Sequence, residues 1–184
     1  MVVLDRVRLR NGEHGYGLVT KTLHWLIAGA IAVQFTIGYL LEVGGGQGRG
    51  RGRGGESGRG RGRGGEIDDL GDDTLLAVHV ALGVTILALA VLRLIWRRTT
   101  PLPPWAPTLS KRERTLTHRT ETALYALMFL IPITGLLMVF TGDHDLLPAH
   151  IVTHIAFFVA ISVHVGLVAK HQLINRDGLL YRML

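Results

Sequence analysis

Four long apolar runs, separated by polar connections, constrain the fold of this chain more than any other feature of its sequence. The runs cover about residues 19–41, 75–96, 123–140 and 151–169, and 48% of the 184 residues are hydrophobic. Each run has the roughly 17–25 residues that a helix needs to cross the hydrocarbon core of a bilayer. We therefore predict an all-α membrane protein, a single domain (residues 1–184) with a bundle of four transmembrane helices at about 19–41, 75–96, 119–140 and 150–171.

Several kinds of chemistry are excluded or left without support. The chain has no cysteine, which excludes thioether-linked haem, cysteine-ligated iron–sulfur clusters and disulfides. It also has no Ser-His-Asp set, HExxH motif or phosphate-binding loop, so nothing points to a hydrolase or a kinase. Any cofactor must be held by other side chains.

The uneven distribution of basic residues predicts the orientation in the membrane. Fourteen of the 20 lysines and arginines lie toward the two termini or around the second connection, six lie in the first connection, and the short third connection has none. The positive-inside rule places both termini in the cytoplasm, although six arginines are unusual for an external loop. Residues 1–18 are not expected to be a cleavable signal, because the apolar run after them is too long for one.

The first connection contains a glycine–arginine repeat, GRGRGRGGE, at residues 48–56 and again at 58–66. Sequence without apolar residues does not build a packed core, so we expect residues 44–73, Gly/Arg-rich and then acidic, to form a flexible, disordered loop. One interpretation is an RGG-type segment that binds nucleic acid or another anionic polymer. A linker lengthened by repetition is favoured, because the predicted outer side of the membrane offers no nucleic acid.

Four histidines lie in or at the edge of the apolar runs, His24, His79, His150 and His164. His150 and His164 leave nearly the same face of one helix, roughly 21 Å apart along its axis. Ionisable residues in membrane spans are costly, and neutral imidazoles can ligate iron without adding net charge. Matching the histidines by depth predicts an inner haem iron between His24 and His164, and an outer one between His79 and His150.

Each of these histidines also has an interpretation other than haem ligation. A single histidine in a span can simply hydrogen-bond a neighbouring helix, but four at matched depths favour ligation. The rival to His150 is His154, which matches the depth of His79 well but lies farther round the helix from the face of His164. His150 is therefore preferred as the outer ligand, with His154 kept as the alternative.

Small and charged residues near these histidines support the prediction of two haem sites. Gly83 lies one turn after His79, and Gly29 lies five residues after His24, where a missing side chain lets a porphyrin approach the backbone. Arg93 lies on the face of His79 at the depth of the inner haem. It is expected to pair with a haem propionate, or else to be a snorkelling anchor at the membrane surface.

Two other histidines and the tryptophans are expected near the inner membrane surface. His171 is expected to have a surface role rather than to bind metal. His118 is expected at the surface too, with the lining of a quinone or haem-edge pocket as its alternative. Trp25, Trp96 and Trp105 fit an aromatic belt at the inner interface.

The sequence resembles the bacterial cytochrome b561 family of dihaem inner-membrane proteins. The matching stretches cover most of the chain: KTLHWL at 21–26, AVHVALGVTILALAVLRLIWR at 77–97, LYALMFLIPITGLLMVF at 124–140 and HIVTHIAFFVAISVHVGLVAKHQLINRDGLLYRML at 150–184. The resemblance implies a multi-pass protein of the bacterial inner membrane with two non-covalent b haems. His24, His79, His150 and His164 fall at the ligand positions, and Gly83 and Arg93 fall where the family has them.

The resemblance also implies a function in electron transfer, either as an oxidoreductase or as a carrier. Family members move electrons between the quinone pool, ubiquinone or menaquinone, and another redox partner. In the best-known bacterial kind, superoxide is oxidised at the outer haem while ubiquinone is reduced. The Gly/Arg repeat departs from the family, and its positive charge would raise the local concentration of a small anion such as superoxide.

Two other functions compete with this one. The chain could be the cytochrome b subunit that anchors a hydrogenase or formate dehydrogenase complex, in which a soluble subunit receives the electrons. It could also be a non-redox membrane protein, such as a metal transporter that uses the histidines. The sequence is compatible with both a monomer and a homodimer.

Overall fold

The computed structural model describes residues 8–13, 15–49, 64–106 and 108–184. Its four long helices are α1 (Leu18–Arg49), α2 (Gly64–Thr99), α3 (Lys111–Thr141) and α4 (Leu147–Ala169). A short 3₁₀ turn, His144–Leu146, precedes α4; a π-helical turn, Lys170–Ile174, follows it, and a second 3₁₀ turn covers Leu179–Arg182. All four long helices are long and apolar enough to cross a membrane, which confirms the predicted all-α bundle.

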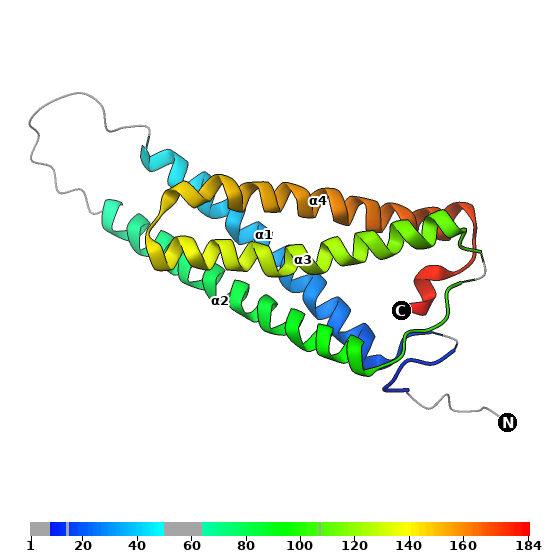
Figure 1. Cartoon of the computed structure of the whole chain (residues 1–184). Coiled ribbons are helices and arrows are strands. Elements are labelled where there is room, and N and C mark those ends of the chain that lie inside the picture. Colours follow the sequence, from blue (N-terminus) through cyan, green and yellow to red (C-terminus); the bar gives the residue numbers. More distant parts are fainter. Residues whose placement is uncertain (1–7, 14, 50–63, 107) are drawn as a thin grey trace, which may run out of the picture.

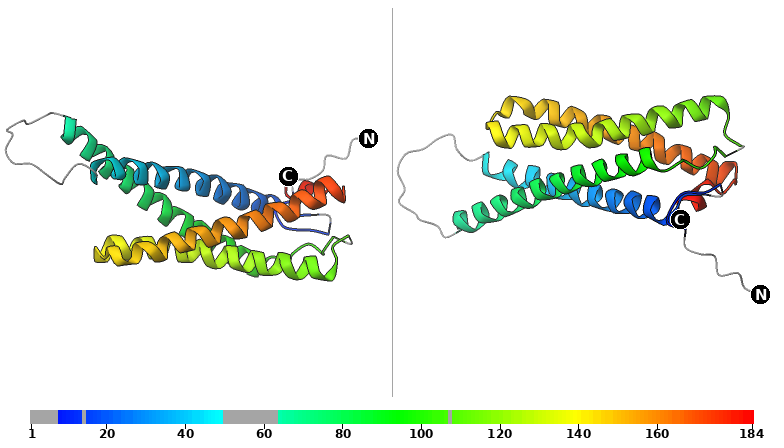
Figure 2. Two further views of the ribbon diagram at one scale, coloured as in Figure 1. Left: turned by 90° about the horizontal axis from the view of Figure 1, so that it is seen from above. Right: turned by 60° about the horizontal axis from the view of Figure 1, so that its bottom comes forward.

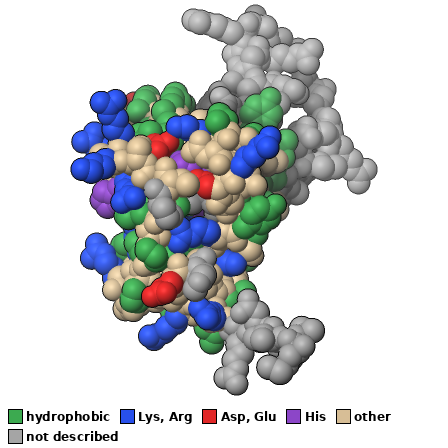
Figure 3. Space-filling model, turned by 90° about the vertical axis from the view of Figure 1, so that its right-hand side faces the viewer, with side chains coloured by type: hydrophobic (Ala, Val, Ile, Leu, Met, Phe, Trp, Pro, Cys, Tyr) green, Lys and Arg blue, Asp and Glu red, His purple; other side chains and the backbone are tan. Residues whose placement is uncertain are grey.

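The helices form two antiparallel hairpins, α1 with α2 and α3 with α4 (Figures 1 and 2). The hairpins are joined mainly through α2 and α3, whereas α1 and α4 do not pack backbone to backbone as the neighbouring pairs do. The described residues before α1, the C-terminal tail and the α2–α3 connection lie at one end of the bundle. The positive-inside rule predicts that this is the cytoplasmic end, and Figure 3 shows Lys and Arg side chains gathered at it.

The centre of the bundle is a small apolar cluster to which each helix contributes one buried residue: Ile27, Ala90, Met128 and Phe157. Many other large apolar side chains point outward and are exposed, including Leu92, Phe140 and Val159. Exposed apolar surface of this extent is unfavourable in water but matches lipid. Packing in the centre and polar contacts between helices therefore hold the bundle together, with lipid around it.

Two helices extend beyond the predicted spans into the connection between them. The structure continues α1 to Arg49 and starts α2 at Gly64, so the edges of the predicted loop 44–73 are helical. Adding one residue to an existing helix costs much less than starting a new one, which lets the spans propagate into polar sequence. Residues 50–63, with most of the repeat, lie outside the described residues.

The third helix also starts earlier than predicted, at Lys111 rather than about 119. Ser110 and Glu113 form a capping box there: the Ser110 Oγ accepts from the Glu113 N–H at 3.3 Å, and the Ser110 N–H donates to Glu113 Oε2 at 2.9 Å. The other end stops at Gly142, whose left-handed φ of 65° lets its N–H donate to the Met138 carbonyl. The cap explains why helix begins in polar sequence, before the apolar run.

Three segments that are far apart in the sequence meet at the cytoplasmic end. Asn11 Nδ2 donates to the Pro101 carbonyl at 3.0 Å, and Asn11 Oδ1 accepts from Thr20 Oγ1 at 2.8 Å. From the chain's last turn, Arg182 Nη2 donates to the Pro104 carbonyl at 2.9 Å. The N-terminal segment, the α2–α3 connection and the C-terminal tail are thus tied together across the end of the bundle.

Candidate functional site

The predicted inner pair of histidines meets across the bundle. The rings of His24 on α1 and His164 on α4 have their centroids 6.3 Å apart and their planes at 56°. Two imidazoles bound to one metal through bonds of about 2 Å have ring centroids roughly 6 Å apart. The two rings therefore meet between helices whose backbones are not packed closely against each other.

Arg93 on α2 contacts this pair directly. Its Nη1 lies 3.0 Å from His24 Nδ1, and its Nε donates to the Tyr125 hydroxyl at 3.1 Å. A guanidinium has only donors, so His24 Nδ1 is the acceptor here, and a neutral ring then carries its proton on Nε2. Metal ligation through Nε2 requires that proton to move to Nδ1, which Arg93 must release.

A polar pocket lies on the cytoplasmic side of Arg93. Arg97 and Glu121 form an ion pair at 2.9 Å, and Trp96 Nε1 donates to Thr20 Oγ1 at 3.0 Å. Tyr16 also lines the pocket, and burial of its phenol, followed by the charge of Glu121, raises its pKa above the ordinary value. The cavity measures only about 40 Å³, which suits one polar group and not a whole ring.

His79, the first of the outer residues, faces α1. Its Nε2 lies 3.2 Å from Gln34 Nε2, which also donates to the His79 carbonyl at 3.0 Å. The other ring nitrogen, Nδ1, is buried without a hydrogen-bond partner. A Cβ placed on Gly38 would lie 3.2 Å from His79 Cε1, so only glycine fits comfortably against this ring.

His150 is held between α3 and α4, with 9% of its surface exposed. Its Nδ1 lies 2.8 Å from Thr134 Oγ1, and this hydroxyl also lies 2.9 Å from the carbonyls of Leu130 and Ile131. When the single hydroxyl proton goes to a carbonyl, Thr134 accepts from the His150 Nδ1–H, and Nε2 keeps its lone pair for a metal. A Cβ on Gly135 would lie 3.1 Å from His150 Cε1.

The rival His154 lies close to the same place. Its ring centroid is 4.3 Å from that of His150 and 5.0 Å from that of Phe35, which it meets edge-on. His79 lies within electrostatic range of both His150 and His154. The difference between the two candidates is local: the described contacts give His150 a hydroxyl partner that fixes its tautomer, and give His154 only aromatic neighbours.

The predicted glycines and the glycines that face histidine rings are not the same. A Cβ on Gly83 would meet Gln34 Nε2 at 3.4 Å, and one on Gly29 would meet open space. The sequence interpretation missed Gln34, Thr134 and Gly38. An amide within an apolar span was the available signal for Gln34, since such a group needs a partner in lipid.

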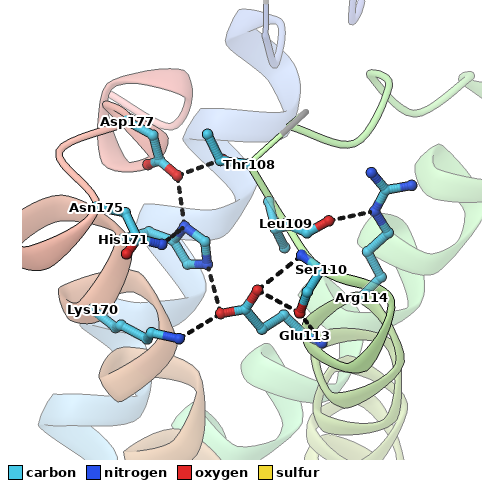
Figure 4. A network of polar contacts seen from close by, with 9 residues as sticks. All are labelled: Thr108, Leu109, Ser110, Glu113, Arg114, Lys170, His171, Asn175 and Asp177. Atoms are coloured by element: carbon cyan, nitrogen blue, oxygen red, sulfur yellow. Dashed lines mark hydrogen bonds and ion pairs between the residues drawn. The ribbon is translucent and has the colours of Figure 1, made fainter.

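His171 differs from its prediction. We expected a surface role, but only 1% of its surface is exposed. Its Nδ1 lies 2.6 Å from Asp177 Oδ2, which also accepts from Thr108 Oγ1 at 2.6 Å, and its Nε2 lies 3.6 Å from Glu113 Oε1 (Figure 4). Lys170 Nζ donates to the same Glu113 oxygen at 2.6 Å.

The C-terminal tail is what buries His171. After the π-helical turn, Arg176 and Gly178 adopt positive φ angles of 50° and 70°, which reverse the chain direction. The reversal brings Asp177 back over His171 and beside the loop before α3. Helical periodicity in the sequence contains no information about this fold-back, so the surface expectation was wrong.

We call the contacts of Asp177 with His171 and Thr108 the tail clasp. Replacing Asp177 with alanine is expected to weaken this clasp. His171 and Thr108 would both lose a hydrogen-bond acceptor, and the loss at the buried His171 ring costs about 1–3 kcal/mol. We expect a lower thermal unfolding midpoint for the detergent-solubilised protein. Asp145→Ala on the exposed opposite end is the matched control, and equal midpoints for the two variants would show that the clasp contributes nothing.

The residues at both depths fit a haem. Three observations support this: the separation of the His24 and His164 rings, the buried Nδ1 of His79 that has no hydrogen-bond partner among the described residues, and Gly135, whose missing side chain lets the His150 ring pack against α3. When bound by two imidazoles, a haem would have no open position on its iron and would supply single-electron transfer.

One comparison with known proteins bears on this arrangement. A family model described as prokaryotic cytochrome b561 matches residues 15–184, which includes all four long helices and every candidate ligand. The four apolar helices fit a multi-pass protein of the bacterial inner membrane. The chain belongs to the prokaryotic cytochrome b561 family of transmembrane electron-transfer proteins that bind b-type haem.

Proposed function

We propose that this protein carries electrons across the membrane through two haems, between the quinone pool and a small redox partner on the outer side. His24 and His164 would hold the inner haem, and His79 and His150 the outer one. The observation that carries the proposal is the His24–His164 pair, whose ring separation of 6.3 Å suits two ligands of one iron. The outer histidines lie on two helices, α2 and α4, at the other depth, which supports a second site.

Arg93 would move from His24 to a haem propionate when the inner haem is bound. In the structure Arg93 donates to His24 Nδ1, but this nitrogen must carry a proton when His24 binds metal through Nε2. Arg93 would then need another partner, and a guanidinium pairs well with a carboxylate. The nearby ion pair of Arg97 and Glu121 would stay in place, with Tyr125 as a common neighbour of both arginines. The propionate would thus replace His24 Nδ1 as the partner of the Arg93 guanidinium.

On this basis Arg93→Gln is expected to lower the midpoint potential of the inner haem by roughly 60 mV, a tenfold change in its redox equilibrium. Removing a positive charge near the iron favours the oxidised, more positive form. Arg93→Lys keeps the charge and should keep the potential near that of the wild type. A potentiometric titration of both variants measures this, and unchanged potentials in both would support the snorkelling-anchor interpretation instead.

The outer partner is proposed from charge and from the family resemblance. The six arginines of the first connection would sit on the outer side in the predicted orientation and attract a small anion. Superoxide is the partner we propose, with ubiquinone or menaquinone at the inner haem. If serine replacements of these arginines leave the salt dependence of haem reduction by superoxide unchanged, the loop has no such role.

Haem quantification together with quinol reduction tests the proposed function. We expect two b haems per chain by pyridine haemochrome, low-spin bands in the reduced-minus-oxidised spectrum, and haem reduction when a short-chain quinol is added. One haem would overturn one of the two pairs. Haem that dithionite reduces but quinol does not would overturn exchange with the quinone pool.

A further inference from the structure

The amide of Gln34 on α1 is a polar group inside the membrane for which the proposed haem sites give no role. Its Nε2 donates to the His79 carbonyl at 3.0 Å and lies 3.2 Å from Nε2 of the His79 ring. Its acceptor, Oε1, is buried and has no hydrogen-bond partner among the described residues. Lipid offers no water to such an oxygen, so an unpaired amide acceptor is costly there and points to a partner beyond these contacts.

His79 on α2 carries the matching unpaired group. Its Nδ1 is also buried, with no partner in the part of the chain that the structure describes. An imidazole that binds iron through Nε2 carries its proton on Nδ1, and metal-bound histidines almost always donate this second N–H to an acceptor. The two unpaired groups are therefore a donor and an acceptor, on side chains that already contact each other.

We propose, on the basis of the outer haem put forward above, that Gln34 is a positioning residue for His79. In this arrangement Gln34 Oε1 accepts the Nδ1–H of the iron-bound ring, while Gln34 Nε2 keeps its bond to the His79 carbonyl. A half-turn of the ring about its Cβ–Cγ bond exchanges the two edges of the imidazole. It places Nδ1 on the edge that faces Gln34, and it moves Nε2 to the edge that faces Gly38, which has no side chain.

The arrangement resolves the conflict at Nε2 and makes the two outer ligands alike. The lone pair of His79 Nε2, which Gln34 Nε2 engages at 3.2 Å, becomes free for the iron. Thr134 on α3 can accept the Nδ1–H of His150 on α4, and Gln34 on α1 would accept that of His79 on α2. Each outer ligand would thus be oriented by the partner helix of its own hairpin.

The proposed hydrogen bond has an electronic consequence that packing alone does not have. An acceptor on the Nδ1–H makes an imidazole more basic and gives it partial negative charge, which favours ferric over ferrous iron. Loss of the Gln34 acceptor should therefore raise the midpoint potential of the outer haem. The inner haem, held by other side chains, should not respond.

Two substitutions of similar size test this role in the full-length, haem-loaded protein by potentiometric titration. Gln34→Met removes the amide and should raise the outer midpoint potential by about 40 mV, roughly a fivefold change in the redox equilibrium. Gln34→Glu keeps an acceptor oxygen whether or not its carboxyl is protonated, so the outer potential should stay at or below the wild-type value. The component of the titration that His150→Ala removes identifies the outer haem.

The control is Thr36→Met, at an exposed position of α1 whose hydroxyl donates to the Ala32 carbonyl of its own helix. It should leave both potentials at wild-type values. An unchanged outer potential in Gln34→Met, or equal shifts in Gln34→Met and Gln34→Glu, would overturn the role of Gln34. Gln34→Ala, which also lacks an acceptor, gives the same comparison if Gln34→Met does not retain the outer haem.

Failure of the proposed function has a different signature. A wild-type protein that holds a single haem would overturn the outer site itself, and this is measured before any variant is made. Two haems in the wild type, with the outer potential insensitive to the Gln34 acceptor, would overturn only the inference about Gln34.

Discussion

Replacing His164 with alanine is expected to halve the haem content of the purified protein, or to leave the inner haem with a single axial imidazole and a high-spin spectrum. The reason is that His164 faces His24 at 6.3 Å between ring centroids, and no other described histidine is in ring contact with His24. Pyridine haemochrome and absorption spectra measure both effects. His118→Ala, on an exposed position of α3, should keep the full complement.

The same measurement distinguishes the two outer candidates. His150→Ala should remove or convert the outer haem, whereas His154→Ala should leave it low-spin, because only His150 has a hydroxyl that holds its Nδ1 proton and leaves Nε2 free. The reverse pattern would assign the outer iron to His154. Full low-spin haem in His164→Ala and in both outer variants would overturn the bis-histidine assignment altogether.

Replacing Gly135 with valine is expected to abolish the outer haem while the inner one remains. The first added carbon would already lie 3.1 Å from His150 Cε1 and 3.7 Å from both ring nitrogens, and valine adds two more carbons that are stiff in a helix. The His150 ring must then leave its position beside Thr134 of α3. Alanine adds only the first carbon, so Gly135→Ala should weaken the site without removing it.

The control for Gly135→Val is Gly166→Val on α4, where an added Cβ meets nothing within 4 Å. Both variants place a branched residue in a membrane helix, so a general effect on folding would appear in both. Haem per chain and the size-exclusion profile are the measurements. If Gly135→Val retains both haems in a monodisperse protein, His150 is not held where the outer iron binds.

The lining of the site explains why steric changes at glycines should have effects as large as the loss of a ligand. Gly38 and Gly135 lie against His79 and His150 on opposite sides of the outer site, and each leaves less than a methyl group of free space. Helices in lipid associate through close packing rather than through the hydrophobic effect. The histidines are therefore positioned by the contact of neighbouring backbones with their rings.

The sequence by itself determined the number of membrane-spanning helices and the approximate position of each apolar span, and it predicted the depth of each candidate ligand. These properties depend on hydrophobic run length and on the constant rise of a helix, which are local. The separation of His150 and His164 along α4 and the position of Arg93 near His24 followed in this way, and the structure has Arg93 3.0 Å from His24. Matching these depths also predicted the pairing of the ligands, and the family motif agreed with it.

Only the tertiary structure decided how each helix is rotated and what the tail covers. Gln34 contacts His79, and Thr134 contacts His150. Both contacts depend on the angle at which two helices meet, and this angle cannot be read from the sequence. His171 is buried because Arg176 and Gly178 turn the chain back, and the Met183 carbonyl of the same tail accepts from Trp25 Nε1 at 3.1 Å. Contacts between segments that are distant in the sequence arise from the whole fold, so the periodicity of apolar residues along one helix does not predict them.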